Sequence, residues 1–313
     1  MTGITDAAPR NVLEVSDLSV EYRGEKRTTR AVDRVSFTIG PGEAFGLAGE
    51  SGCGKSTAAN AIMRLLRDPA VITGGSILFD GRDVLAMSPD ELRSFRWREV
   101  AMVFQSAMNS LNPVMTIGDQ IMDIFTTHEG MTKKQARVRA AELLDLVQID
   151  AGRLKAYPHQ LSGGMRQRVV IAMAVALHPT LLIMDEPTTA LDVVVQQEIM
   201  AQIGDLQQEL GFSILFITHD MSLMIELCDR MAVMYSGRFV ETAGAKGLFA
   251  NPRHPYTRAL INAFPPMHGP VAELTGLGEG VRFTNIPDLV EVSPGHLAAL
   301  DSAGTHDILG GRS

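Results

Sequence analysis

A glycine-rich turn reads Gly49-Glu50-Ser51-Gly52-Cys53-Gly54-Lys55-Ser56-Thr57 and separates a short apolar run, 43–48, from a helix-forming run, 58–63. Glycines in such a turn permit positive φ, so successive backbone N–H groups can point inward at a helix N-terminus. A turn of this kind surrounds the β-phosphate of a nucleotide, and its lysine reaches the β- and γ-phosphate oxygens. The order strand, turn, helix is the context that this motif requires. The sequence therefore predicts a nucleotide-binding loop at 49–57.

Length and composition limit the classes of protein to consider. The chain has 313 residues, 45% of them apolar, which suits one large domain with an appendage or two domains. It has no apolar run long enough to cross a membrane and no signal-peptide pattern, so we expect a cytosolic chain. Two cysteines are too few for a disulfide framework or a four-thiolate metal site. A net charge of −8 disfavours general attraction to nucleic acid.

Hydrophobic periodicity predicts an α/β protein with antiparallel strands near its start and one inserted helical subdomain. Alternating residues at 12–22 and 31–39 are typical of antiparallel strands with one solvated face. Amphipathic patterns at 116–125 and 132–147 indicate a helical subdomain of about 106–160 inserted into the core. The remaining pattern predicts strands at 43–48, 75–79, 100–104, 181–184, 213–218, 230–235 and 238–241, and helices at 58–63, from 88, at 166–177, 192–210 and 221–227.

A second set of motifs occupies the later half of the chain. Leu161-Ser162-Gly163-Gly164-Met165 opens a predicted helix with Ser162 as its N-cap, and a helix start of this kind can bind phosphate. The apolar run 181–184 leads into Asp185-Glu186, as expected for a buried parallel strand whose carboxyl end faces a ligand. Three more polar positions follow predicted strands or helices: Gln105, the run Thr189-Ala190-Leu191-Asp192, and His219.

Taken in order, these motifs resemble those of ATP-binding cassette (ABC) transporter ATPase subunits. The resemblance covers about residues 12–264, and Met165 departs from the glutamine that is usual in the family. It implies a P-loop NTPase fold of the α/β class, with a parallel-sheet core, an antiparallel β subdomain, an inserted helical subdomain and a C-terminal extension. We therefore expect a nucleotide-binding domain at 1–250 and the extension at 251–313.

Other residues resemble one branch of that family, the oligopeptide and dipeptide importers, which also include nickel, opine and oligosaccharide importers. These residues are Ser110-Leu111-Asn112-Pro113 after Phe104-Gln105, and His254-Pro255-Tyr256-Thr257-Arg258-Ala259-Leu260. Many members of the branch hold an iron–sulfur cluster on cysteines of the tail. The tail of this chain has no cysteine, so we expect no iron–sulfur cluster.

The resemblance implies roles for individual residues in ATP hydrolysis. Glu186 accepts a proton from the attacking water, Gln105 and His219 orient that water, and Lys55 neutralises phosphate charge. Mg²⁺ is expected on Ser56, Gln105 and Asp185. The nucleotide contacts are expected at Tyr22, Gly49, Ser51, Gly52, Cys53, Gly54, Lys55, Ser56, Thr57, Ser162, Gly163, Gly164 and Asp192.

Some of these residues also have ordinary interpretations. Tyr22 resembles the aromatic residue that stacks on adenine, but tyrosine is common in strands. Cys53, next to a lysine and a helix N-terminus, is either an unusually acidic thiol or a small residue that fits the turn. His219 on its own has the pattern of a packed or solvated histidine, and its functional interpretation depends on the resemblance.

The resemblance also implies partners. ATP is sandwiched between two such domains, so Ser162, Gly163, Gly164 and Asp192 serve a second ABC ATPase subunit, either another copy or a paralogue. Two transmembrane permease subunits and, through them, an extracytoplasmic solute-binding protein complete the importer, which places this chain at the cytoplasmic face of the membrane. Selection of the solute then belongs to those other subunits.

The expected function is ATP hydrolysis that drives import of peptides or related small solutes, with nickel, opine or oligosaccharide import as the alternative. A soluble ABC ATPase that acts on ribosomes or nucleic acid is disfavoured by the acidic charge and by the lack of a tandem cassette. An unrelated P-loop kinase or GTPase would lack the motif at 161–165.

Overall fold

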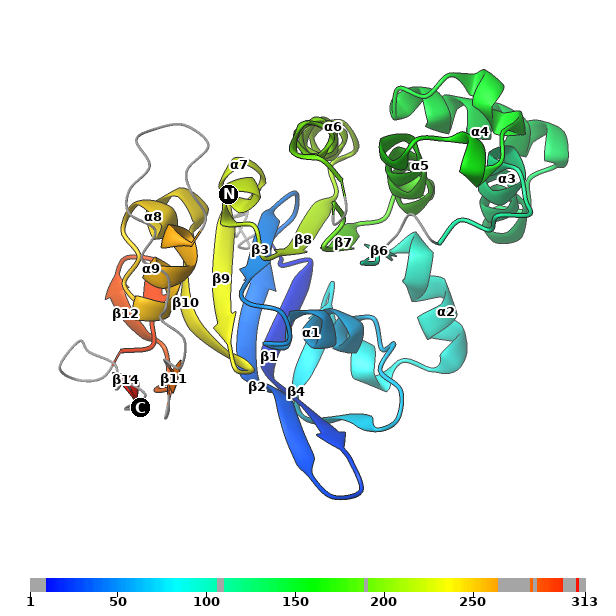
Figure 1. Cartoon of the computed structure of the whole chain (residues 1–313). Coiled ribbons are helices and arrows are strands. Elements are labelled where there is room, and N and C mark those ends of the chain that lie inside the picture. Colours follow the sequence, from blue (N-terminus) through cyan, green and yellow to red (C-terminus); the bar gives the residue numbers. More distant parts are fainter. Residues whose placement is uncertain are drawn as a thin grey trace, which may run out of the picture. The chain divides into compact units, whose positions relative to one another are not determined.

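The computed structural model of the chain describes residues 10–105, 110–188, 191–263, 282–283, 286–300 and 308–309. Thr189 and Ala190 and the segments 1–9, 106–109, 264–281, 284–285, 301–307 and 310–313 lie outside the described residues. The chain divides into two compact units, one of Met1–Met87 with Leu215–Ser313 and the other of Ser88–Ile214 (Figure 1).

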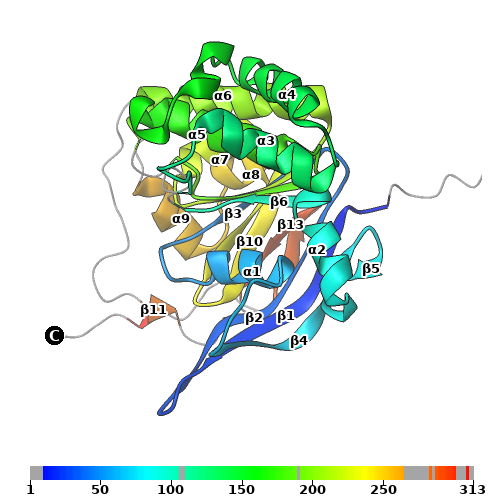
Figure 2. The same cartoon turned by 90° about the vertical axis from the view of Figure 1, so that its right-hand side faces the viewer.

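The first unit contains the predicted antiparallel sheet. Its strand order is β2-β1-β4-β5, and Figure 2 shows β1 and β2 as a long ribbon that ends at their shared hairpin. Apolar residues such as Leu13, Val15 and Ile39 are buried in this sheet, whereas Glu14 and Thr38 next to them are half-buried and Ser16 is exposed. The strands are β1 (Leu13–Arg23), β2 (Thr28–Ile39), β4 (Ala70–Phe79) and β5 (Arg82–Asp83).

Two of these strands begin earlier than the sequence predicts. β2 starts at Thr28 rather than at 31, because Thr28 lies opposite Arg23 and Arg30 lies opposite Glu21 in the antiparallel pair with β1. The side chains of Arg30 and Glu21 also form an ion pair, with Nη2 3.0 Å from Oε1. β4 starts at Ala70 rather than at 75, opposite Tyr22. In β2, backbone pairing carries the strand into polar residues that give no strand signal. In β4, the strand continues through Gly74 and Gly75 to the apolar residues Val71 and Ile72, although glycine pairs are typical of strand ends.

A second sheet of the first unit has the order β12-β13-β10-β9-β3-β8. Every residue of β3 is buried, and β3 runs parallel to β9 with Phe45 opposite Arg230. The strands are β3 (Ala44–Ala48), β8 (Ser213–Thr218), β9 (Arg230–Tyr235), β10 (Arg238–Gly244), β12 (Val290–Ser293) and β13 (His296–Ala298). The helices are α1 (Lys55–Ile62), α7 (Met221–Leu227), α8 (Ala245–Ala250) and α9 (Pro255–Asn262), with a short 3₁₀ helix η1 (Val84–Ala86).

Part of the expected C-terminal extension is built into this unit. β13 pairs antiparallel with β10, with Ala298 opposite Glu241, and α8 and α9 pack against β10 (Figure 1). A further two-stranded pair is formed by β11 (Arg282–Phe283) and β14 (Ile308–Leu309). The division at residue 250 stays a prediction, and strand pairing across it joins the tail to the fold.

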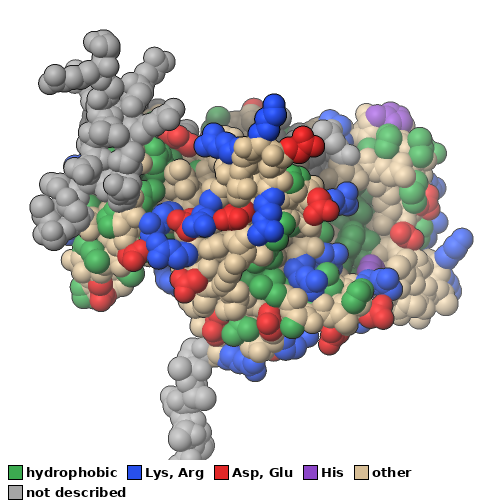
Figure 3. Space-filling view, turned by 90° about the horizontal axis from the view of Figure 1, so that it is seen from below, with side chains coloured by type: hydrophobic (Ala, Val, Ile, Leu, Met, Phe, Trp, Pro, Cys, Tyr) green, Lys and Arg blue, Asp and Glu red, His purple; other side chains and the backbone are tan. Residues whose placement is uncertain are grey.

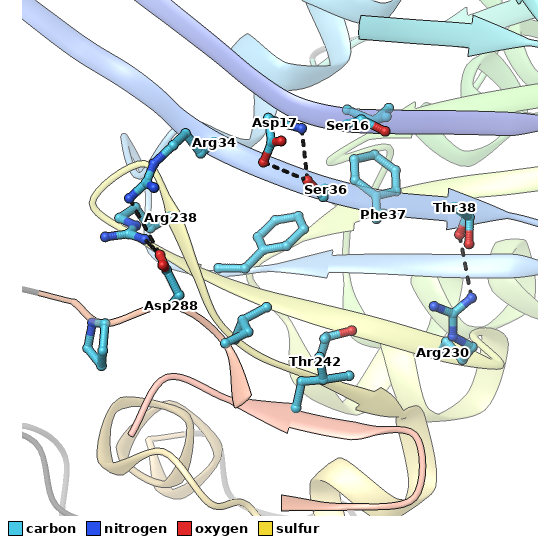
Figure 4. A pocket seen from close by; sticks show the side chains of 15 residues that line it. Ser16, Asp17, Arg34, Ser36, Phe37, Thr38, Arg230, Arg238, Thr242 and Asp288 are labelled. Carbon is cyan, nitrogen blue, oxygen red and sulfur yellow. Dashed lines mark hydrogen bonds and ion pairs between the residues drawn. The ribbon is translucent and has the colours of Figure 1, made fainter. Parts of the chain in front are cut away.

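A pocket of about 530 Å³ lies where the tail meets β2 and β10 (Figure 4). Arg34 and Arg238 point to the carboxylate of Asp288, at Nη2–Oδ1 distances of 3.5 and 2.6 Å. Arg230 pairs with Glu43 at 2.9 Å. Carboxylates therefore balance the arginines of the pocket, and Asp288 links the tail to both strands.

The second unit contains the predicted helical segment together with two parallel strands. Helix α2 starts with a capping box between Ser88 and Glu91, and α4 starts with another between Thr132 and Gln135. β6 and β7 run parallel, with Val103 opposite Met184. The elements are α2 (Pro89–Arg98), β6 (Val100–Val103), α3 (Ile117–His128), α4 (Lys133–Leu146), η3 (Ala151–Lys155), η4 (Pro158–Gln160), α5 (Gly163–Val175), β7 (Leu181–Asp185) and α6 (Val193–Leu210).

The helices and the charged side chains of one face can be compared with what a membrane span or a basic surface would need. Within the described ranges, no helix combines the length and the apolar character that a membrane span needs. On the face shown in Figure 3, basic and acidic side chains are interspersed.

Candidate nucleotide site

The phosphate loop has the backbone that its glycines predict. It connects β3 to α1, and φ is +146° at Gly49, +80° at Gly52 and +116° at Gly54. A Cβ atom at Gly49 would lie 2.3 Å from the carbonyl oxygen of Met234, and one at Gly54 would lie 2.2 Å from that of Ala31. Only glycine fits these two positions. Gly54 also gives α1 no side-chain cap, so its first turn presents N–H groups to an anion.

The ammonium group of Lys55 is held inside this loop. Lys55 is 4% exposed, and its Nζ donates to the carbonyl oxygens of Gly49 at 2.6 Å and Glu50 at 2.8 Å. A buried ammonium that hydrogen-bonds loop carbonyls has a fixed position, from which it can interact with phosphate oxygens at short range. The structure thus places the predicted lysine at the loop rather than on the surface.

Cys53 is a packed thiol rather than an acidic one. It is 8% exposed, and its Sγ lies 3.8 Å from Lys55 Nζ. Burial raises the pKa of Cys53 above its ordinary value, and the attraction of Lys55 only partly opposes this shift. The thiol is therefore protonated at neutral pH, which supports the interpretation of Cys53 as a small residue that fits the turn.

Tyr22 and His219 belong to the same unit as the loop. Tyr22 lies on β1, is 38% exposed, and its hydroxyl is 3.3 Å from Thr57 Oγ1 in the first turn of α1. The tyrosine ring therefore lies beside the end of the loop. His219 is exposed and directly follows β8, the sheet neighbour of β3.

In the second unit, Gln105 and Glu186 meet at the carboxyl ends of neighbouring parallel strands. Gln105 Nε2 donates to Glu186 Oε2 at 2.8 Å. Asp185 is the last residue of β7 and is 4% exposed, whereas Glu186 follows with φ of +47°. A positive φ is uncommon for glutamate, and such residues concentrate at functional sites. Carboxylates at the ends of parallel strands face the ligand crevice in α/β proteins.

The Ser162-Gly163-Gly164 motif and Asp192 form a second group in that unit. The Ser162 hydroxyl caps α5 and accepts from the Met165 N–H at 3.3 Å, and Asp192 caps α6 and accepts from the Val195 N–H at 3.0 Å. A Cβ at Gly164 would lie 2.7 Å from Val195 Cγ1, so glycine allows the helix starts to approach. The two caps share a pocket of about 450 Å³ lined by Ser162, Gly163, Gly164, Met165, Arg168, Leu191, Asp192, Val195 and Glu198.

One residue that contacts the loop was absent from the predicted site. The hydroxyl of Tyr256, on α9, accepts a hydrogen bond from the backbone N–H of Glu50 at 3.0 Å. Tyr256 is fully buried. The only sequence signal for it was its place in the His254-Pro255-Tyr256 run, which indicated a family branch and no contact.

Family comparisons agree with this set of motifs. Residues 32–189 match the ABC transporter family, and residues 240–287 match the family described as oligopeptide/dipeptide transporter, C-terminal region. A probable peptide ABC transporter ATP-binding protein of Sinorhizobium fredii is 44% identical over 92% of this chain and 94% of its own length. A dipeptide transport ATP-binding protein of Haemophilus influenzae is 47% identical over 81% of this chain and 78% of its own length.

Solved structures give the same result for the fold. A dimeric ATP-binding cassette in a post-hydrolysis state, bound to ADP and Pi, aligns with a TM-score of 0.66 and 28% identity over 74% of this chain and 98% of that one. A Clostridium perfringens protein from an ABC transporter complex aligns with a TM-score of 0.67 and 28% identity over 77% of this chain and 92% of its own.

Proposed function

Because this chain belongs to the ABC transporter family, we propose that it is the ATP-binding and ATP-hydrolysing subunit of an importer of peptides or related small solutes. The observation that carries this function is the phosphate loop between β3 and α1, with Lys55 buried against two loop carbonyls. The match of residues 240–287 to the C-terminal region of oligopeptide and dipeptide transporters supports the peptide branch.

Each site residue has a distinct task in phosphoryl transfer to water. Lys55 and the loop N–H groups bind the β- and γ-phosphates, and Tyr22 stacks on the adenine. Glu186 takes the proton of the attacking water, while Gln105, which donates to its carboxylate, and His219 orient that water. The hydrogen bond from Gln105 keeps the carboxylate of Glu186 in one orientation.

The predicted metal ligands suit Mg²⁺ in their chemistry. The hydroxyl of Ser56, the amide oxygen of Gln105 and the carboxylate of Asp185 are hard oxygen donors, which Mg²⁺ prefers. Asp185 is 4% exposed at the end of a strand, so its carboxylate has a fixed position. When bound, Mg²⁺ neutralises part of the charge that develops on the phosphate oxygens.

Ser162, Gly163, Gly164 and Asp192 serve the nucleotide of a second ATPase subunit. Two helix starts face one pocket in this unit, and helix N-termini favour anions. One of the solved relatives is a dimer bound to ADP and Pi, which supports a paired arrangement. The partner is a second copy or a paralogue, and the pair works with two permease subunits at the cytoplasmic face of the membrane.

Co-purification tests this function directly. The full chain, expressed with an affinity tag in its own host, should be isolated with two multi-span membrane proteins and should hydrolyse ATP in a Mg²⁺-dependent reaction. Isolation with ribosomes or DNA, in place of membrane proteins, would contradict the importer role.

A further inference from the structure

The peptide group between Gly49 and Glu50 is held from both of its sides. Its N–H donates to the hydroxyl of Tyr256 at 3.0 Å, and its carbonyl oxygen accepts from Lys55 Nζ at 2.6 Å. One planar unit thus connects a buried phenol with the ammonium of the phosphate loop. The orientation of this peptide therefore sets the position of the Gly49 carbonyl oxygen, which accepts from the ammonium of Lys55.

A peptide next to glycine needs such a restraint. Gly49 has φ of +146°, and glycine has more conformational freedom in the unfolded chain than any other residue. A side chain cannot supply the restraint, because a Cβ at this position would lie 2.3 Å from the carbonyl oxygen of Met234. The restraint on the N–H side comes instead from Tyr256.

Tyr256 is itself firmly placed. It lies in the first turn of α9, and its own N–H donates to Nδ1 of His254, the N-cap of that helix, at 3.1 Å. Its ring centroid is 4.7 Å from that of Tyr235 and 6.2 Å from that of Phe283. Burial raises the pKa of Tyr256 above its ordinary value, so the phenol stays neutral.

The start of α9 is fixed in turn by a buried carboxylate. Glu241 on β10 has no exposed surface, and it accepts from the N–H groups of Arg253 at 2.7 Å and His254 at 2.9 Å. Nε2 of His296, on β13, lies 2.6 Å from Glu241 Oε1. A continuous set of contacts therefore runs from the tail strand through Glu241 and α9 to the phosphate loop.

We propose that Tyr256 is a positioning residue for ATP binding: its hydroxyl holds the Gly49–Glu50 peptide so that Lys55 is correctly placed for the β- and γ-phosphates. This inference rests on the proposed function. It makes the C-terminal segment a part of the nucleotide site, because a residue outside the phosphate loop sets the conformation of that loop.

The test compares two tyrosines of one aromatic cluster in the full chain. Tyr256→Phe removes the hydroxyl that the loop contacts and keeps the ring. Tyr235→Phe is the matched control, because the Tyr235 hydroxyl accepts from the N–H of Phe283, at 3.3 Å, and has no part in the loop. Binding of a fluorescent ATP analogue, KM and kcat for ATP, and thermal unfolding midpoints are measured for both variants and for the unmodified chain.

We expect Tyr256→Phe to raise the KM for ATP and the Kd for the analogue about three- to tenfold, the effect of one net hydrogen bond. Its kcat at saturating ATP should stay within about twofold, because no reacting atom is changed. Tyr235→Phe should leave KM and Kd unchanged, whatever its effect on the unfolding midpoint. A merely structural role for Tyr256 would lower the midpoint and leave KM and Kd unaltered.

Three results would overturn the inference: an unchanged KM and Kd in Tyr256→Phe, an equal rise in both variants, or a loss confined to kcat. Failure of the proposed function looks different. In that case the unmodified chain itself neither binds the ATP analogue nor hydrolyses ATP.

Discussion

The side-chain amide of Gln105 donates to the carboxylate of Glu186 at 2.8 Å, although the two residues are 81 positions apart in the sequence. Gln105 comes two residues after β6 and Glu186 directly follows β7, and the parallel register of these strands sets Val103 opposite Met184. The contact is therefore fixed by sheet pairing. It brings a water-orienting amide and the proposed base to the same point.

Glu186→Gln should keep ATP binding and lower turnover by at least about a hundredfold, because a carboxamide cannot accept the proton of the attacking water. ATP hydrolysis and binding of a fluorescent ATP analogue measure the two effects separately. Glu142→Gln, which changes an exposed glutamate on α4, is the control and should hydrolyse ATP at the normal rate. Turnover at the unmodified rate in Glu186→Gln would refute the base assignment.

Lys55→Ala should weaken ATP binding by at least about tenfold, since hydrogen bonds from a charged group contribute about 1.5–3 kcal/mol. Because Lys55 is buried and hydrogen-bonds a carbonyl of the loop, a loss of ATP affinity in this variant reports on the phosphate loop. Lys133→Ala removes an exposed lysine at the start of α4 and serves as the comparison. Titration with a fluorescent ATP analogue is the measurement, and equal affinity in both variants would overturn the loop assignment.

Gly164→Ala should lower ATP hydrolysis while ATP binding to the phosphate loop is kept. The new methyl group would lie 2.7 Å from Val195 Cγ1, and a β-branched valine has few rotamers with which to move away. The first turns of α5 and α6 would be pushed apart, and these turns carry the residues that we propose contact the nucleotide of the partner subunit. Hydrolysis, analogue binding and dimer formation in ATP are the measurements.

Gly204→Ala is the matched control for that variant. Gly204 lies inside α6, and a Cβ there would meet nothing within 4 Å. Alanine is the better helix former by about 0.5–1 kcal/mol, so this change should raise the free energy of unfolding and leave hydrolysis as it is. Normal hydrolysis in Gly164→Ala would show that the close approach of the two helices does not matter for turnover.

Stability should fall at alkaline pH. Burial raises the pKa values of Cys53, Cys228 and Tyr256, so these groups ionise in the unfolded chain at a pH where the folded chain keeps them neutral. The folded state then binds more protons, and the free energy of unfolding decreases as pH rises above the ordinary thiol pKa of about 8.5. The slope is up to about 1.4 kcal/mol per pH unit for each group.

Denaturant unfolding between pH 7 and pH 10.5 measures this slope. Near pH 7 these three groups should contribute no pH dependence to the free energy of unfolding. Toward pH 10.5 the free energy of unfolding should fall. Cys228→Ala removes one of the three groups and should make the fall less steep. An identical slope in that variant would show that Cys228 ionises equally in both states.

The sequence predicted the elements whose side chains carry a strong pattern. β3, β7 and β8 are runs of buried residues, and α5 begins after Ser162, the N-cap that the sequence predicts. The predicted start of β2 was wrong because polar residues there pair through their backbone, and that of β4 was wrong because the strand continues through Gly74 and Gly75. The state of Cys53 stayed open, because a sequence shows a neighbouring lysine but does not show burial.

The candidate site was predictable to a similar degree. The motifs named the loop residues, Gln105, Asp185, Glu186 and the Ser162 group, since their order and their places after strands or before helices are local features. The Tyr256 contact could not be predicted, because it depends on tertiary packing between α9 and the loop. No periodicity or turn signal reports on such a contact.

Glu50 and Tyr256 are separated by 206 residues, so they leave the ribosome at very different times during synthesis. The phosphate loop emerges early, and its tyrosine partner emerges only when most of the chain has been translated. By the positioning role proposed for Tyr256, a nascent chain binds ATP about three- to tenfold more weakly until α9 has been made and has folded onto the loop.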